Sequence, residues 1–447
     1  MNEHKPQRNI VIIGGGFAGI ELARRLERRL PSDWQTTLLS QDNFITYSPL
    51  LPEVVGASVL PGHVVAPLRQ MVRRARVRMV TVSEIDLAER TVSYLGEGTG
   101  VMQYDQLVLA CGLQANLSMV KGVSRYALPL KTLGDALFLR NRVVSRLEHA
   151  ELQPNAELRR WLLTFVVIGG GFSGVEVAGE LVDFLRAGIR FYPNIRTEEI
   201  KVVLVHGTDR LLPELTASLG DYALRQMQMD GLDIRLNARV VNVDDGGVEL
   251  GDGMRIRAGT VVCTIGTKTN TLLNDIGLPM ERGRIATAPD MSVSQFPGVW
   301  AIGDCAAVLN AHDQRTAPPT AQFAVRQARL VAGNICAKLH NRSTRPFSYR
   351  ALGQLSSVGH NRAVAELLGL RISGFVAWLM WRGVYLLKVP TLARKVRLFL
   401  EWNWAMFFPP DLAHFSFRLT PRDSPLRAKE TPEGRSVLTC ATEPVVD

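Results

Sequence analysis

Two stretches of the chain share one pattern of hydrophobic and polar positions. Each begins with a short apolar run rich in β-branched residues, at 10–13 and 165–168, continues with three glycines, and leads into apolar residues at helical spacing. An apolar run this short is typical of a buried strand, and the period then changes to that of a helix. The pattern therefore predicts a strand, a tight turn and a helix, built twice in one chain.

Both copies carry glycines at the spacing GxGxxG, at Gly14, Gly16 and Gly19 and again at Gly169, Gly171 and Gly174. In a strand-turn-helix context the first glycine makes the turn, the second lets a pyrophosphate approach the backbone, and the third lets the helix pack on the strand. The unpaired N–H groups at the helix N-terminus then face the phosphates. A single match also occurs as a turn without a ligand, but two matching copies favour two dinucleotides, a flavin and a nicotinamide.

Further strand patterns end in small residues. Ala110 and Gly112 close the run 104–112, Gly266 closes 260–266, and Gly303 and Asp304 close 298–304. Parallel sheets bind ligands at the carboxyl ends of their strands. Asp304 is therefore expected to hydrogen-bond a hydroxyl of the first ligand, which requires the chain to return to the first sheet.

The second strand of each predicted unit ends without the acidic residue that usually binds a ribose 2′-hydroxyl. Ser40 stands there in the first copy and still offers a hydrogen bond, so FAD binding is retained. His206 stands there in the second copy. It could accept from the ribose when neutral or tolerate a 2′-phosphate beside Arg210, so the choice between NADH and NADPH stays open.

Composition narrows the classes of protein further. The chain has 447 residues, of which 46% are hydrophobic and 21% charged, which excludes a disordered or low-complexity protein. The net charge of +10 favours an anionic partner, but no nucleic-acid motif accompanies the basic run 73–78, so no nucleic acid is expected. Five scattered cysteines without a CxxC pair argue against a disulfide framework, a zinc module and a dithiol centre, and no metal is expected. Residues 1–9 carry no secretory pattern, so the protein is expected to face the cytosol.

The composition shifts from residue 370 onward. Four of the seven tryptophans, at 378, 381, 402 and 404, alternate there with lysines and arginines in short apolar helices. This mixture is typical of an element that lies in the membrane interface. A core-packing or dimer-forming pair of helices would have a similar composition. The apolar run 372–380 is bracketed by Arg371 and Arg382 and is too short to span a bilayer.

At this point the residues resemble those of the type II NADH dehydrogenases, single-chain NADH:quinone oxidoreductases with two dinucleotide-binding domains. The resemblance covers about 8–415. It rests on the two glycine motifs, the segment 43–53, the Gly303-Asp304 pair, the AQxA motif in 319–324 and the motif 171–176. It implies FAD as cofactor, NADH as substrate, a membrane quinone as acceptor, and peripheral membrane binding through C-terminal helices.

The resemblance also assigns residues to the reaction. Glu176 is implied near the nicotinamide and quinone sites as a candidate proton relay, and Gln322 as a donor to a quinone carbonyl. A first-turn acid favoured by the helix dipole would explain Glu176 equally simply, since Glu21 is its equivalent in the first copy. Ala321 and Ala324 are small enough to let a flat ring approach. Arg326 replaces the second Gln of the family motif AQxAxQ, where a guanidinium could bind a quinone carbonyl or indicate another acceptor.

The expected fold is α/β, with two Rossmann-like dinucleotide-binding domains, for FAD and NAD(P), and a C-terminal amphipathic helical membrane-docking segment. The predicted boundaries are 1–120 and 285–345 for the FAD domain, 121–284 for the NAD(P) domain, 346–417 for the docking region and 418–447 for a flexible tail. The expected location is peripheral, on the cytoplasmic face of the inner or plasma membrane, and a homodimer is possible.

Three alternatives remain beside this reading. Sulfide:quinone oxidoreductases need paired cysteines across the flavin, and 113–164 contains none. A soluble NAD(P)H-dependent flavoprotein reductase of another acceptor would not need the Trp- and Arg-rich segment. A flavin-binding redox sensor or membrane-associated scaffold would bind FAD but be reduced slowly, whatever the acceptor.

Overall fold

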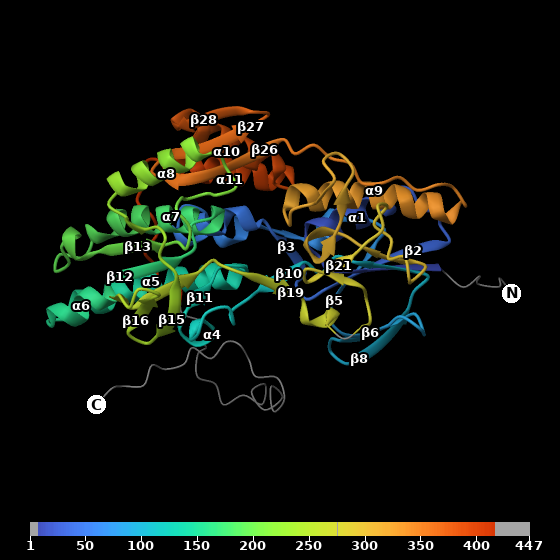
Figure 1. Cartoon of the computed structure of the whole chain (residues 1–447), viewed down its shortest axis with the longest axis horizontal. Coiled ribbons are helices and arrows are strands. Elements are labelled where there is room, and N and C mark those ends of the chain that lie inside the picture. The colour runs from blue at the N-terminus through green and yellow to red at the C-terminus, as the bar shows by residue number, and fades with distance from the viewer. Residues whose placement is uncertain (1–7, 275, 416–447) are drawn as a thin grey trace. The chain divides into compact units, whose positions relative to one another are not determined.

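The two apolar runs form the central strands of two parallel sheets. The computed structural model describes residues 8–274 and 276–415 (Figure 1). The first sheet has the order β22-β9-β1-β2-β5, and the second β11-β18-β12-β13-β14. Their strands are β1 (Arg8–Ile13), β2 (Trp34–Ser40), β5 (Arg76–Met79), β9 (Gln106–Leu109), β22 (Val299–Ala301), β11 (Leu128–Pro129), β12 (Thr164–Ile168), β13 (Lys201–Val205), β14 (Asp233–Arg235) and β18 (Thr260–Cys263).

The two sheets repeat one topology around their central strands. A glycine turn and a helix follow each central strand, α1 (Phe17–Leu26) after β1 and α7 (Phe172–Ile189) after β12. Strand β22 comes from the chain beyond the second sheet and pairs with β9, in the register Val299 with Leu107. The chain therefore returns to the first sheet. The predicted α/β class with two Rossmann-like units is confirmed, and the boundaries between domains stay predictions.

Shorter antiparallel sheets and further helices surround the two parallel sheets. The remaining helices are α2 (Leu51–Val55), α3 (Leu68–Met71), α4 (Val123–Tyr126), α5 (Leu133–Leu152), α6 (Ala156–Leu162), α8 (Ala217–Met229), α9 (Ala321–Leu339), α10 (Phe375–Lys388) and α11 (Leu392–Trp404). The small sheets comprise β3 (Phe44–Thr46) with β4 (Val65–Pro67); β6 (Thr81–Asp86), β7 (Thr91–Leu95) and β8 (Thr99–Gln103); β10 (Leu113–Ala115) with β19 (Thr267–Thr269); β15 (Val240–Asp244), β16 (Gly247–Leu250) and β17 (Arg255–Arg257); β20 (Met280–Glu281), β21 (Arg284–Ala286) and β23 (Ala306–Ala307); and β24 (Leu309–Asn310) with β25 (Arg315–Thr316).

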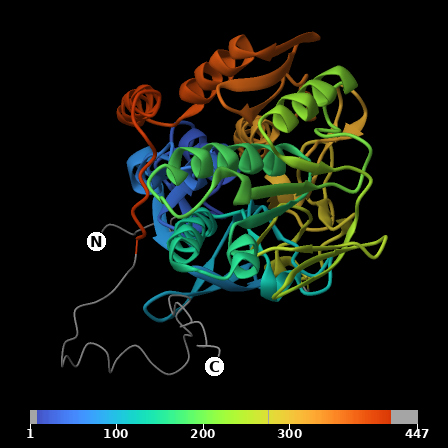
Figure 2. The same ribbon diagram turned by 90° about the vertical axis from the view of Figure 1, so that its left-hand side faces the viewer.

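A three-stranded antiparallel sheet precedes the C-terminal helices. It consists of β26 (Gly353–Gly359), β27 (Arg362–Leu367) and β28 (Leu370–Gly374), and β26 packs against α7 (Figure 2). The sequence pattern does not predict this sheet, because its strands mix serine, glycine and charged residues with apolar ones and show no strong alternation. The sheet places α10 and α11 beside α7 and α2 rather than at the end of a linker.

The structure corrects the interpretation of the tryptophans. Trp378, Trp381 and Trp402 are 5%, 2% and 2% exposed and belong to the core, whereas Trp404 is 62% exposed. Three of the four rings therefore pack inward, as the core-packing alternative requires. Across residues 8–274 and 276–415, no helix has both the length and the apolar character that a membrane crossing needs. The predicted tail 418–447 lies outside the described residues.

Candidate active site

In the first glycine turn, a side chain would clash at Gly14 and Gly19 but not at the middle glycine, Gly16. Gly14 has φ +111°, and a β carbon on it would lie 2.3 Å from the carbonyl oxygen of Ala110. A β carbon on Gly19 would lie 1.9 Å from the carbonyl oxygen of Gly14, so only glycine lets α1 approach β1 this closely. A β carbon on Gly16 would meet nothing within 4 Å. Gly16 is the second glycine of the motif, the position at which a dinucleotide pyrophosphate approaches the backbone and a side chain would be in its way.

The second turn repeats this arrangement. Gly169 has φ +117°, and a β carbon on Gly174 would lie 1.8 Å from the carbonyl oxygen of Gly169. A β carbon on Gly171 would meet only the Oε1 atom of Glu214, at 3.8 Å. Each turn therefore has a glycine that neither packing nor backbone strain explains. The residues present fit a dinucleotide at both turns.

The residues that end the second strands lie beneath these turns. A β carbon on Gly15 would lie 2.4 Å from Ser40 Oγ, and one on Gly170 would lie 2.7 Å from the His206 ring. Both ring nitrogens of His206 have partners: the N–H of Gly170 donates to Nδ1 at 3.0 Å, and Thr208 Oγ1 lies 2.8 Å from Nε2. Burial lowers the His206 pKa, partly opposed by Glu214, so the ring is neutral and holds the turn.

The loop after β22 lies at the edge of the first sheet, as the predicted ligand contact requires. Gly303 has φ +74°, and a β carbon on it would lie 3.8 Å from that of Ala324. The N–H of Gly303 donates to Gln327 Oε1 at 2.7 Å within the core. Burial raises the pKa of the neighbouring Asp304, and the charges of Lys131 and Arg284 partly oppose that rise.

The first two turns of α9 hold the predicted quinone-side residues. Gln322 Oε1 accepts from the hydroxyl of Tyr349 at 3.0 Å, and its Nε2 donates to the carbonyl of Gly353 at 3.5 Å. The guanidinium of Arg326, one turn further along α9, lies 5.2 Å from the centre of the Tyr349 ring. Ala321, at the start of the helix, is partly exposed, whereas Ala324 is buried.

Glu176 and Glu21 occupy equivalent positions of the two repeats in opposite electrostatic surroundings. Burial raises the pKa of Glu21, but hydrogen bonds with Arg329 at 2.7 Å and Arg25 at 3.0 Å outweigh burial and hold it below its usual range. Burial raises the pKa of Glu176 to about 8, against the N–H of Ser357, which donates to Oε1 at 3.3 Å. Glu176 is therefore protonated at neutral pH, unlike a simple helix-capping acid.

Both predicted catalytic side chains contact β26, Gln322 at Gly353 and Glu176 at Ser357. An open hollow of 290 Å³ adjoins this strand. Its lining includes Leu352, Gly353 and Glu214, whose Oε1 atom would lie 3.8 Å from a β carbon on Gly171. The strand and the hollow thus lie between the second glycine turn and the first turn of α9.

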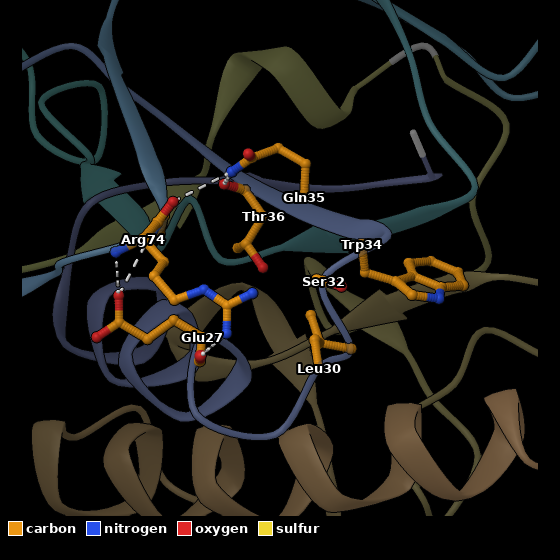
Figure 3. Close-up of a pocket in the computed structure, with 8 residues that line it drawn as sticks. Glu27, Leu30, Ser32, Trp34, Gln35, Thr36 and Arg74 are labelled. Carbon is orange, nitrogen blue, oxygen red and sulfur yellow. Dashed lines mark hydrogen bonds between the residues drawn. The ribbon is translucent and has the colours of Figure 1, made fainter. Parts of the chain in front are cut away.

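A smaller hollow of 70 Å³ lies at the opposite end of β2 (Figure 3). Figure 3 shows Glu27 tied to Arg74, whose N–H donates to Glu27 Oε2 at 3.0 Å, and Gln35 bonded to the Arg74 carbonyl at 3.3 Å. Trp34 begins β2 here, whereas Ser40 ends the strand at the glycine turn. The hollow is therefore separate from the dinucleotide turns.

Family comparisons match almost the whole described chain. The model of the pyridine nucleotide-disulphide oxidoreductase family matches residues 8–328, and that of the NDH2 C-terminal domain matches 352–409. The type II NADH:quinone oxidoreductase Ndh of Mycobacterium tuberculosis is 32% identical over 416 residues, which cover 89% of this chain and 88% of that protein. The chain belongs to the type II NADH:quinone oxidoreductases.

Other similar proteins agree with this assignment. The type II NADH:quinone oxidoreductase of Staphylococcus epidermidis is 26% identical over 82% of this chain and 92% of its own length. The structure of NDH2 from Plasmodium falciparum in complex with NADH has a TM-score of 0.85 and 19% identity, covering 91% of this chain and all of that one, which supports the fold. The predicted family, oxidoreductase class, and use of FAD with NADH are confirmed for this type II enzyme.

Sequence reasoning missed several residues of this type II enzyme. Gln327 holds the Gly303 loop, and its only signal is a polar side chain on an apolar helix face. Glu53 comes from a distant part of the chain, yet its charge acts on both Glu176 and Glu180 of α7. Cys111 and Cys305 are free, and hydrogen bonding with Cys305 raises the pKa of Cys111; their distance along the chain hides this contact.

Proposed function

We propose that this chain oxidises NADH and reduces quinone at the ends of the two parallel sheets, beside β26. FAD would lie along the first sheet and NADH along the second. The FAD contacts are assigned to Gly14, Gly16, Gly19, Ser40, Ala110, Gly112, Gly303 and Asp304. The NADH contacts are assigned to Gly169, Gly171, Gly174, His206 and Gly266, and the quinone side to Ala321, Gln322, Ala324 and Arg326.

One observation carries this assignment: a β carbon would meet nothing within 4 Å at Gly16 and only Glu214 Oε1, at 3.8 Å, at Gly171, while the glycines on either side are packed against backbone or side chains. The helix N-termini at these turns offer N–H groups to two pyrophosphates. FAD, when bound, supplies the redox chemistry, whereas the protein supplies geometry and protons.

Residues of the chain itself would donate a proton to the acceptor and bind it. Glu176 holds a proton at neutral pH and stands at the buried start of α7, so it is suited to donate one to a reduced acceptor. The Gln322 amide has one N–H beyond its contact with Gly353, which is available to a quinone carbonyl. Arg326 lies one turn away and adds a fixed positive charge.

The donor preference is proposed to be NADH. His206 is neutral and its ring nitrogens are occupied, so it offers no charge to a 2′-phosphate. A guanidinium nitrogen of Arg210 donates to the carbonyl of Pro213 at 3.0 Å. A ribose hydroxyl would meet Thr208 and the backbone rather than a cation.

The test is an anaerobic titration of the purified enzyme with bound FAD. NADH should bleach the flavin absorbance rapidly, NADPH should do so slowly, and a short-chain quinone should restore the absorbance. Bleaching without recovery by quinone would favour a soluble reductase of another acceptor. Failure of both nucleotides to bleach the flavin would contradict the assignment of the second glycine turn.

The C-terminal helices are proposed to dock on the lipid surface. On α10 and α11 the face opposite the buried tryptophans is apolar and exposed, with Phe375, Val376, Leu379, Leu387, Leu392, Val396, Phe399, Leu400 and Trp404 each at least half exposed. The spacing of these residues makes a continuous stripe on each helix. Exposed stripes of this kind are typical of membrane or partner contacts. We place this face on the cytoplasmic side of the inner or plasma membrane; a homodimer through the same face is the competing arrangement.

A further inference from the structure

A carboxylate stands beside the middle glycine of the second turn, and the first turn has no counterpart. Glu214 Oε1 would lie 3.8 Å from a β carbon on Gly171, whereas a β carbon on Gly16 would meet nothing within 4 Å. In their first and third glycines the two turns are packed alike. Glu214 is therefore a feature of the turn assigned to NADH alone.

The chain on either side of Glu214 is fixed against this turn. The N–H of Leu212 donates to the carbonyl oxygen of Gly170 at 2.8 Å, and the N–H of Leu215 donates to the carbonyl oxygen of Leu212 at 2.9 Å. Both leucine side chains are buried, whereas Glu214 is exposed. The backbone at Glu214 is therefore held in place beside the turn, while its carboxylate stays in contact with water.

Glu214 also acts on the residue that follows β13, where a dinucleotide ribose usually meets an acidic side chain. His206 stands there instead. Burial lowers the pKa of His206, and the charge of Glu214 partly opposes that shift. Glu214 thus brings to this region, from the following loop, the negative charge that the strand end lacks.

The hydroxyl and the cation closest in sequence to His206 already have partners. Thr208 Oγ1 pairs with the His206 ring, and Arg210 donates to the carbonyl of Pro213. In the part of the chain that the structure describes, no hydrogen bond or ion pair engages the Glu214 carboxylate. Its two oxygens are therefore available to hydroxyl donors of a ligand.

The space beside Glu214 is open, and its charged lining is mainly acidic. The hollow of 290 Å³ that adjoins β26 has Glu214, Glu366 and Arg350 as its charged lining residues. Glu366 Oε2 accepts from the N–H of Thr216 at 3.1 Å. Two carboxylates beside one guanidinium suit a neutral sugar better than an additional phosphate, because like charges repel.

NADH and NADPH differ at one position of the adenosine ribose, where NADH has a hydroxyl and NADPH a phosphate. A carboxylate accepts a hydrogen bond from the hydroxyl but repels the phosphate, so one side chain can bind the first and exclude the second. Resting on the function proposed above, we infer that Glu214 selects NADH over NADPH by accepting hydrogen bonds from the adenosine ribose.

Two other effects of Glu214 are separable from this role. Loss of its charge would lower the His206 pKa further and leave the ring neutral, so His206 does not take part in the selection. A carboxylate that only faced the pyrophosphate at Gly171 would weaken both nucleotides equally. Selection at the ribose instead changes the affinities for NADH and NADPH in opposite directions.

The experiment measures the binding of two nucleotide fragments to the FAD-loaded enzyme by isothermal titration calorimetry. ADP-ribose and its 2′-phosphate carry the discriminating ribose without the nicotinamide, so their binding does not depend on flavin reduction. Wild type should bind ADP-ribose roughly tenfold or more tightly than the 2′-phosphate. Glu214→Gln should weaken ADP-ribose roughly threefold or more and tighten the 2′-phosphate, and Glu214→Arg should reverse the preference. The KM values for NADH and NADPH should shift in the same directions.

The matched control is Asp209→Asn, which removes the other carboxylate of the loop 206–215 and should leave both affinities unchanged. Asp209 is not among the nearest atoms that β carbons on Gly169, Gly170 and Gly171 would meet. The melting temperature of every variant is measured as well.

Four outcomes would overturn the role of Glu214. They are equal binding of the two fragments by wild type, wild-type selectivity in Glu214→Gln, an equal loss of selectivity in Asp209→Asn, and tighter binding of both fragments in Glu214→Gln. The last would show that the carboxylate only repels the pyrophosphate. Wild-type enzyme that binds neither fragment would instead overturn the proposed NADH site at the second turn.

Discussion

The indole N–H of Trp402 donates to the Oε2 atom of Glu53 across 2.9 Å of buried space. This bond joins the C-terminal helix α11 to α2, beside α7. The next residue back on α11, Glu401, accepts from the N–H of Leu60 and contacts His63 in the same region. The proposed docking helix is thus bonded directly to the buried carboxyl of Glu53.

Removal of this bond should destabilise the enzyme. Trp402→Phe keeps an aromatic ring, smaller than the indole, but leaves the Glu53 carboxyl without its N–H donor, so we expect a loss of about 1–3 kcal/mol in the free energy of unfolding. Urea unfolding followed by fluorescence measures it. Trp404→Phe is the matched control, since Trp404 is 62% exposed and should change stability little. Equal stability of the two variants would contradict the importance of the bond.

The buried carboxyls should make stability depend on pH. The Glu176 pKa rises from 4.5 to about 8 on folding, so between these values the native state binds a proton that the unfolded state has released. Stability due to this group is therefore full below pH 4.5 and falls as pH rises toward 8, by up to about 1.4 kcal/mol per pH unit. Glu21 has a lowered pKa and acts only at more acidic pH.

Comparison of wild type with Glu176→Gln isolates this contribution. The variant should lose less stability between pH 5 and pH 8, measured by urea unfolding at each pH. Parallel pH profiles of the two proteins would show that Glu176 is ionised in the native state, contrary to its surroundings.

Substitution of the middle motif glycines, Gly16 and Gly171, should affect FAD binding and NADH binding separately. Gly16→Ala meets no protein atom within 4 Å, so it should fold normally yet retain little FAD, because the methyl group occupies the place of the pyrophosphate. Gly171→Ala should keep its FAD and raise the KM for NADH roughly tenfold or more. Flavin absorbance and steady-state kinetics measure both effects.

Gly62→Ala is the control for these variants, as its β carbon also meets nothing within 4 Å but lies outside both turns. Full FAD content in Gly16→Ala would contradict the assignment of a dinucleotide to the first turn. An unchanged KM for NADH in Gly171→Ala would contradict the assignment of NADH to the second turn.

The exposed stripe on α11 should be needed for lipid binding but not for catalysis in solution. Phe399→Glu combined with Leu400→Glu places two charges on an apolar face, so co-sedimentation with anionic liposomes should fall roughly tenfold or more while activity with a short-chain quinone persists. Leu152→Glu, at an 82% exposed position on α5, is the control. A variant that still sediments but becomes monomeric would favour the dimer interface instead.

Local pattern was enough to predict the two strand-turn-helix units, the closed and open glycines, and the carboxyl-end position of Asp304. These features depend on residues close together in the chain, through the helix and strand periods and the steric demands of the turns. The resemblance to the type II NADH dehydrogenases added FAD as cofactor, NADH as substrate and quinone as acceptor to these predictions. The antiparallel sheet β26-β27-β28 escaped prediction, since its stability comes from packing against α7 rather than from a strong alternation of its own.

Sequence by itself therefore determined the repeated dinucleotide fold and the family, whereas only the tertiary structure decided which equivalent residues carry charge. Glu21 and Glu176 occupy equivalent positions in their motifs. The hydrogen bond from Arg329 helps to hold Glu21 ionised, whereas burial near Glu53 keeps Glu176 protonated. The same holds for the tryptophans, of which three pack inward and Trp404 stays outside. Burial and electrostatic neighbours come from segments far apart in the chain, as with Trp402 and Glu53, and no local pattern encodes which segments meet.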